Sequence, residues 1–176
     1  MCSSDLAAVV TDPDKREKFS VASLAIVPRY AVLDPELMVG LPPHITAHTG
    51  MDAMTHAVEA YIGRIGTPYT DENAEKAVRI LFQDLEAVYQ EGNDIDRRSN
   101  VAMASYCAGL AFTRAIVGYV HAIAHNLGGL YGVPHGLANA IVLPYILEFS
   151  REDCEGKLAQ LARVGGLGDQ SDPDAE

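Results

Sequence analysis

Aspartate and histidine recur at helical spacing in two short segments of the chain. Asp52 and His56 lie four residues apart, and so do His121 and His125. Residues four apart on a helix share a face, so each pair can direct two ligand atoms at one ion. His135 follows His125 by ten residues, at the expected start of the next helix, and the intervening loop would bring it back toward the preceding helix.

A mixed set of one carboxylate and two or three imidazoles suits Fe(II), Zn(II) or a similar divalent ion. The surrounding residues are apolar and small, and a desolvated aspartate there is costly unless a cation compensates its charge. An ion with one open coordination position would act as a Lewis acid on a bound oxygen. A single Asp/His pair is more often a surface or capping pair, but two pairs and the Pro-His-Gly turn together favour a metal site. Spacing alone leaves open whether His121 or His125 is the ligand. His44 and His48 flank the start of the first predicted helix, where a solvated or capping role is favoured.

The elements that must position these side chains are mostly helices. Helical periodicity begins after Pro43, and small residues line one face of the helix expected near 95–116, which indicates a central helix of a bundle. Thr70 is a candidate N-cap, and Pro144 is expected to kink or break a helix. The predicted helices are 45–62, about 71–91, 95–116, 119–131, one from 135 past 139, and 157–164, after β-like runs at 7–11, 18–22 and 25–33.

Composition narrows the class of protein. The 176 residues carry 13 Lys and Arg against 24 Asp and Glu, a net charge of −11, which argues against nucleic acid or an anionic membrane as a partner. No apolar run approaches the ~18 residues of a membrane span, and no signal peptide is recognisable at the start. Three cysteines without a CxxC pair make a disulfide framework or a thiolate zinc site improbable, so a cytoplasmic location is expected.

Three segments carry a recognisable set of motifs: GMDAMTHAVE at 50–59, GYVHAIAHNLGG at 118–129 and VPHGLAN at 133–139. Together they resemble the iron-containing (group III) alcohol dehydrogenases. The stretches DPEL at 34–37 and LPP at 41–43 are similar to the linker of that family, and the resemblance extends from about 7 to 149. It implies a hydride-transferring oxidoreductase that uses Fe(II), with Zn(II) as an alternative, and NAD(P) on a small alcohol, aldehyde or ketone. It also allows a homodimer of the full-length enzyme.

The resemblance assigns roles residue by residue. It implies that the metal ligands are Asp52, His56, His121 and His135. His125 would then be the catalytic, non-ligand histidine beside the nicotinamide and the substrate, available for proton relay. Cofactor contacts are implied for Lys18, Leu37, Gly40 and His125.

The resemblance also implies a division of the chain. We expect a mainly α fold: a helical bundle over 41–166 similar to the C-terminal domain of dehydroquinate synthase, preceded by strands and linker at 1–40. The Gly, Asp, Ser and Pro content of 167–176 separately predicts a disordered tail. Family members carry a Gly-Gly-Gly-Ser phosphate loop in an N-terminal dinucleotide domain, and this sequence has no such run. The short β segment is therefore expected to be a remnant of that domain, and the chain an inactive fragment.

Two other functions fit the same residues. One is metal-dependent lyase chemistry without hydride transfer, as in relatives resembling dehydroquinate synthase. The other is a non-catalytic helical module that binds a metal for stability alone. Consumption of NAD(H) discriminates the first from a dehydrogenase, and the effect of a chelator on melting without any alcohol oxidation identifies the second.

Overall fold

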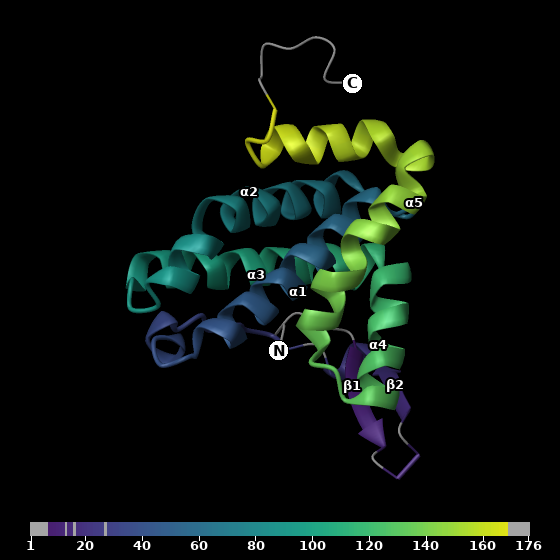
Figure 1. Cartoon of the computed structure of the whole chain (residues 1–176), viewed down its shortest axis with the longest axis horizontal. Coiled ribbons are helices and arrows are strands. Elements are labelled where there is room, and N and C mark those ends of the chain that lie inside the picture. The colour runs from purple at the N-terminus through teal and green to yellow at the C-terminus, as the bar shows by residue number, and fades with distance from the viewer. Residues whose placement is uncertain (1–6, 13, 16, 27, 169–176) are drawn as a thin grey trace.

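Five long helices make up most of the described chain. The computed structural model describes residues 7–12, 14–15, 17–26 and 28–168 (Figure 1). The expected mainly helical fold is confirmed, and the helices are α1 (Pro43–Ile62), α2 (Pro68–Gln90), α3 (Ile95–Ala115), α4 (Tyr119–Tyr131) and α5 (His135–Val164).

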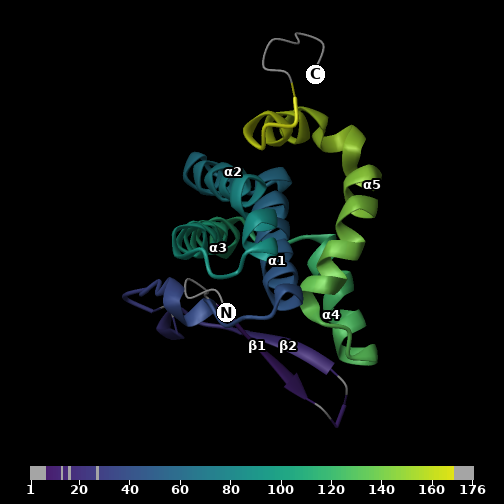
Figure 2. The same cartoon turned by 60° about the vertical axis from the view of Figure 1, so that its left-hand side comes forward.

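Helix α1 is the centre of the bundle. It contacts α2, α3 and α5, while α4 packs on α5, so α1 lies between the α2–α3 layer and the α4–α5 pair (Figures 1 and 2). Close approach within the first layer follows from small side chains, because Ala104, Ala108 and Ala111 of α3 are completely buried. Interiors packed this closely tolerate little change in volume, so the position of α1 is tightly determined.

Local signals explain where the helices begin and end. Helix α2 begins at Pro68 behind a capping box, in which Thr67 and Thr70 each accept a hydrogen bond from the other's backbone N–H. The N-cap is therefore Thr67, and the expectation that Thr70 fills this position was wrong. Asp94 caps α3 by accepting from the Arg97 N–H, and α4 ends at Gly132 in the left-handed conformation, where glycine has no steric penalty.

Helix α5 corrects the expectation at Pro144. The backbone stays helical through Pro144, which is exposed, and leaves helical geometry only at Cys154 (φ −139°, ψ 19°). An exposed proline loses one backbone hydrogen bond, and water can satisfy the carbonyl that is left. The turn at Cys154, in contrast, redirects the last part of α5 so that it runs alongside α2 (Figure 1). The helical piece expected at 157–164 is thus the second half of α5.

The β segment is a hairpin. Strands β1 (Ala7–Asp12) and β2 (Glu17–Ala22) pair antiparallel from Ala7 opposite Ala22 to Asp12 opposite Glu17, and β2 contacts α4 (Figure 2). The third run expected at 25–33 is not a strand in its described part. It begins with a 3-10 turn, η1 (Leu24–Ile26), where Ser23 Oγ accepts from the Ala25 N–H, and Pro28 then lacks the N–H that a ladder needs.

The linker to the bundle is a second short turn. In η2 (Pro35–Met38), the Asp34 side chain accepts from the Glu36 N–H, and the turn contacts α3. The domain boundaries expected at 40 and 166 stay predictions. Residues 169–176 of the expected tail lie outside the described residues.

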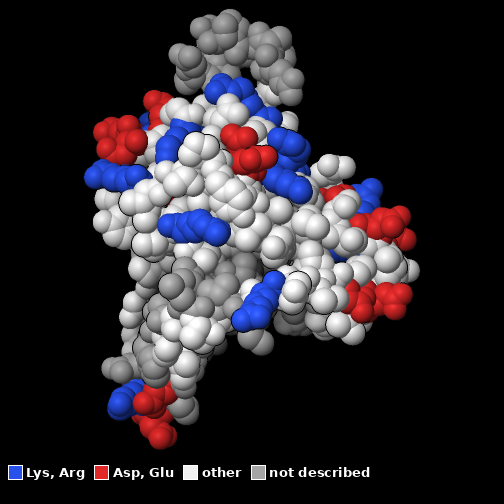
Figure 3. Space-filling model, turned by 180° about the vertical axis from the view of Figure 1, so that it is seen from behind, with Lys and Arg blue, Asp and Glu red and all other residues white. Residues whose placement is uncertain are grey.

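The surface shows no large field of one sign on the face seen from behind. Lys and Arg side chains there are interspersed with Asp and Glu side chains (Figure 3). Within the described part of the chain no single helix is long and apolar enough to cross a membrane. Helices α3 and α4 are long and apolar enough only when taken together, and the chain bends by 104° between them.

Candidate metal centre

The four side chains expected to bind metal come together from three helices. Asp52 and His56 lie on α1, His121 on α4 and His135 at the first position of α5. Nε2 of His135 lies 3.4 Å and Nε2 of His121 3.6 Å from Asp52 Oδ1, and Nε2 of His56 lies 3.8 Å from Asp52 Oδ2. Three imidazole nitrogens therefore surround one carboxylate. Ligand atoms of Asp52, His56 and His121 all lie within 4.8 Å of one another, a spacing that one ion can bridge.

A glycine lets α5 begin against α1. A Cβ at Gly136 would lie 2.6 Å from the His48 carbonyl carbon and closer still to its oxygen, so only a residue without a side chain permits this approach. His48 precedes Asp52 by one helical turn, and His135 precedes Gly136 directly. The close contact therefore places the His135 ring beside the Asp52 carboxylate.

Asn139 completes the cluster, and sequence reasoning missed its role. It is fully buried, and its amide Nδ2 lies 2.6 Å from Asp52 Oδ1 and 3.2 Å from both His121 Nε2 and His135 Nε2. The Asp52 oxygen and the two histidine nitrogens thus converge on the partly positive NH₂ group, as they would on a cation. These electron-pair donors therefore fit a divalent ion. The sequence signal that could have found Asn139 is its position four residues after His135. The same spacing links Asp52 to His56 and His121 to His125.

Glu59 is the second residue whose role the sequence analysis missed. It lies on α1 three residues after His56, is 4% exposed, and contacts His121 on the ring edge opposite the cluster. Its Oε2 lies 2.6 Å from His121 Nδ1. Helical spacing from His56 was the only sequence signal, and a glutamate at that spacing is equally compatible with a solvent-exposed face.

Burial and mutual charge shift the protonation of the cluster. Burial raises the pKa of Asp52, but the His121 hydrogen bond and the neighbouring imidazoles outweigh it and lower the pKa to about 2. Burial, followed by repulsion from His121, lowers the pKa of His56 to about 3. Burial also lowers the pKa of His121, but its hydrogen bonds to Asp52 and Glu59 dominate and raise it. At neutral pH Asp52 is ionised and His56 is neutral, which are the states required of metal ligands.

His125 lies beside this cluster on the next turn of α4. Its ring centroid is 4.9 Å from that of His135 and 6.2 Å from that of His121. The His121 ring, in turn, stacks at 4.2 Å on the ring of His56. The geometry therefore separates the two α4 histidines, with His121 directed at Asp52 and His125 adjoining His135.

The other cofactor candidates lie on the N-terminal elements. Leu37 is 81% exposed in η2, and Gly40 is exposed in the link to α1. Lys18 lies in β2 opposite Thr11, and its side chain lies outside the described part of the structure. The hydrogen bonds and ring contacts that join Asp52 to its neighbouring histidines include neither Leu37 nor Gly40. His44 and His48 contact each other at the start of α1, with ring centroids 5.9 Å apart.

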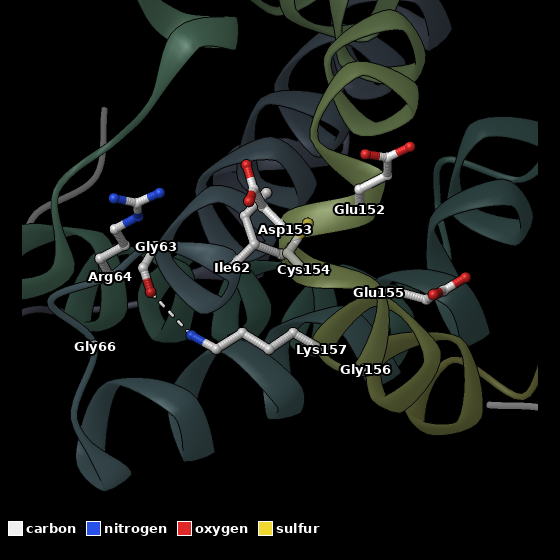
Figure 4. Close-up of a pocket in the computed structure, with 10 residues that line it drawn as sticks. All are labelled: Ile62, Gly63, Arg64, Gly66, Glu152, Asp153, Cys154, Glu155, Gly156 and Lys157. Atoms are coloured by element: carbon white, nitrogen blue, oxygen red, sulfur yellow. Dashed lines mark hydrogen bonds between the residues drawn. The ribbon is translucent and has the colours of Figure 1, made fainter.

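The cavity of about 450 Å³ at the end of α1 contains none of the candidate ligands (Figure 4). Lys157 reaches across it and donates from Nζ to the Tyr61 carbonyl at 2.8 Å and the Gly63 carbonyl at 2.9 Å. These carbonyls belong to the last turn of α1 and its C-cap, so the cation satisfies acceptors that the helix leaves unpaired. The cavity is lined by Ile62, Gly63, Arg64, Gly66, Glu152, Asp153, Cys154, Glu155, Gly156 and Lys157.

Comparisons with known proteins agree on one family. The sequence model for the C-terminal part of the Fe-containing alcohol dehydrogenase family matches residues 46–176. The 1,3-propanediol dehydrogenase of Klebsiella pneumoniae is 44% identical over 158 residues, which are 90% of this chain and 41% of that protein. The crystal structure of a 1,3-propanediol oxidoreductase matches with a TM-score of 0.92 and 40% identity, over 97% of this chain and 45% of that chain.

A second solved structure carries a nicotinamide cofactor. Sulfoacetaldehyde reductase from Bifidobacterium kashiwanohense, crystallised in complex with NAD+, matches with a TM-score of 0.86 and 31% identity, over 92% of this chain and 43% of that chain. The present chain thus spans less than half the length of the relatives it matches.

Proposed function

The chain belongs to the Fe-containing alcohol dehydrogenase family, and from this membership we propose that it supplies the metal-binding helical part of a dehydrogenase. The proposed reaction is hydride transfer between a small alcohol and NAD(P), with the aldehyde or ketone as the oxidised partner. The observation that carries the proposal is the arrangement of three imidazole Nε2 atoms around the Asp52 carboxylate.

The proposed ligands are Asp52, His56, His121 and His135, which would hold Fe(II) or Zn(II). One carboxylate oxygen and three imidazole nitrogens form a donor set that both ions accept. The position of the Asn139 amide, within 3.2 Å of three of these four side chains, supports one common point of convergence. The direction of His121 toward Asp52 supports His121 over His125 as the ligand from α4.

In this proposal the ion, when bound, supplies Lewis-acid polarisation of the substrate oxygen, and the nicotinamide exchanges the hydride. The ionised Asp52 contributes a negative charge that offsets the cation, and the neutral His56 offers an unprotonated nitrogen. His125 receives or returns the hydroxyl proton at a ring nitrogen, since it adjoins the cluster and is only half-buried. Lys18, Leu37 and Gly40 are proposed to contact the cofactor.

The metal site is tested by replacing ligands in the 176-residue chain. After anaerobic purification and loading with Fe(II) or Zn(II), elemental analysis of wild type should give bound metal, and His121→Ala with His135→Ala should lose it. His44→Ala, which removes an exposed histidine of α1, is the matched control and should retain the metal. Unchanged metal content in the double variant would refute the ligand assignment.

The reaction is tested with protein expressed from the complete gene. We expect a metal-loaded preparation to form NAD(P)H from a primary alcohol, seen as absorbance at about 340 nm, and His125→Ala to lower the rate while metal content stays the same. Metal binding without any NAD(P)H turnover would favour lyase chemistry or a structural metal. Cell fractionation and the mass in solution test the proposed cytoplasmic location and homodimer.

A further inference from the structure

We propose that Glu59 is a positioning residue that fixes the tautomer and ring orientation of His121. This inference rests on the proposed metal site but not on dehydrogenase activity. Both side chains are buried to 2% exposure, and Glu59 Oε2 lies 2.6 Å from His121 Nδ1. A contact of this length between a carboxylate and an imidazole is a charge-assisted hydrogen bond, in which Nδ1–H donates.

The hydrogen bond determines which nitrogen is available to an ion. A neutral imidazole carries one proton, so a proton held at Nδ1 by Glu59 leaves Nε2 with its lone pair. Nε2 is the atom that lies 3.6 Å from Asp52 Oδ1 and 3.2 Å from the Asn139 amide. Glu59 therefore directs the unprotonated edge of His121 at the cluster and makes it the stronger ligand.

The second oxygen of Glu59 anchors the helix that carries His121. Oε1 accepts from the Val120 N–H at 2.7 Å, at the start of α4, where Gly118 provides no side-chain cap. An anion at a helix N-terminus is favoured by the exposed N–H groups and the helix dipole. A Cβ at Gly118 would lie only 2.9 Å from Oε1, so the glycine permits the approach. One side chain of α1 thus sets both the position of α4 and the rotation of its ligand.

An amide cannot reproduce this arrangement. A carboxylate accepts at both oxygens, whereas glutamine has one acceptor oxygen and one donor nitrogen. In Glu59→Gln, either Val120 N–H or His121 Nδ1–H would face an NH₂ group, or the His121 proton would move to Nε2 and block the metal edge. The conservative substitution is therefore expected to weaken metal binding although it preserves size and shape.

The test measures divalent-ion affinity in the 176-residue chain by competition with a chromophoric chelator, using Zn(II). Glu59→Gln should weaken binding by about 10- to 100-fold, as for other partners of metal-bound histidine. Glu75→Gln is the matched control, because Glu75 is a partly buried carboxylate that accepts from Tyr61 Oη outside the cluster. It should bind within about twofold of wild type, well below the 10-fold effect of a lost positioning partner.

A second readout does not need metal. Long-range ¹H–¹⁵N spectra of the metal-free chain, labelled at histidine and recorded above the raised pKa of His121 so that the ring is neutral, should show His121 protonated at Nδ1 in wild type and at Nε2, or mixed, in Glu59→Gln. Gly118→Ala, which keeps the charge of Glu59 but displaces its carboxylate, should give the same two effects and serves if Glu59→Gln fails to fold. Wild-type affinity together with an unchanged His121 tautomer in a folded variant would overturn the role of Glu59.

The two proposals fail separately. If wild type binds no divalent ion, the metal site is refuted, and the tautomer measurement still decides whether Glu59 orients His121. If wild type binds Zn(II) and the His121/His135 double variant does not, the metal site stands, and the affinity of Glu59→Gln decides the further inference.

Discussion

Replacing Gly136 with alanine should disable the metal cluster while leaving the rest of the bundle folded. The added Cβ would lie 2.6 Å from the His48 carbonyl carbon, and both atoms belong to backbone or are fixed to it. Ordinary van der Waals contact begins at 3.4 Å. The start of α5 must therefore move away from α1 by at least about 0.8 Å, since backbone cannot yield as a flexible side chain does.

This displacement is large compared with the tolerance of metal–ligand distances, whereas its cost in folding free energy is moderate. Metal–ligand distances hold to within about 0.2 Å, so moving His135 with the helix end should weaken Zn(II) binding by 10-fold or more, on the order of 1.4 kcal/mol. Overpacking of this kind costs about 1–3 kcal/mol, which corresponds to a melting temperature lower by roughly 2–12 °C for a chain of this size.

The assay compares Gly136→Ala with a glycine-to-alanine change on the same helix. Gly156 has no atom within 4 Å of its would-be Cβ, so Gly156→Ala should bind Zn(II) as wild type does and gain up to about 1 kcal/mol from helix propensity. Affinity is measured by chelator competition and stability by circular dichroism. Wild-type affinity and melting temperature in Gly136→Ala would refute the argument that this close approach positions His135.

Three further results are expected. Without metal, the free energy of unfolding should fall as the pH drops, between pH 6.5 and 3 because of His56 and between pH 3.8 and 2 because of Asp52. The lowered pKa values mean that the unfolded chain binds protons more readily than the folded chain does. Urea titrations measure the loss, about 2 kcal/mol for Asp52, and His56→Leu should make the fall between pH 6.5 and 3 shallower. Lys157→Met should cost about 2 kcal/mol in thermal melting without changing Zn(II) affinity, because the Tyr61 and Gly63 carbonyls lose a charged donor. Zn(II) at about 100 times its Kd should stabilise the chain by about 2.7 kcal/mol, and chelator should reverse the gain; an unchanged melting temperature would contradict a metal site formed in the folded state.

The helices and the pairing of candidate ligands on single helices were predictable because both depend on short-range spacing. Four-residue separations placed Asp52 with His56 on one face, and the alanine pattern of α3 identified a buried helix. The choice between His121 and His125 depends on how α4 is rotated against α1, and spacing within one helix carries no such information.

The roles of Glu59 and Asn139 were beyond sequence reasoning for a related reason. Glu59 acts on a residue 62 positions away and Asn139 on one 87 positions away, so their partners are defined only by the packing of α1 against α4 and α5. The predictions at Pro144 and at 25–33 failed for local reasons. An exposed helical proline gives up a hydrogen bond that water replaces, and a β-like composition does not form a strand where Pro28 lacks a donor.

The separation of 87 residues between Asp52 and Asn139 has a consequence for folding order. The α2–α3 layer can close around α1 through contacts between neighbouring helices, but the cluster exists only after the chain has returned from α3 through α4 to α5. Contacts this distant in sequence form late, since the entropy of closing the loop must be overcome first. Metal uptake would therefore follow the docking of α5, and its rate would report the last step in assembling the bundle.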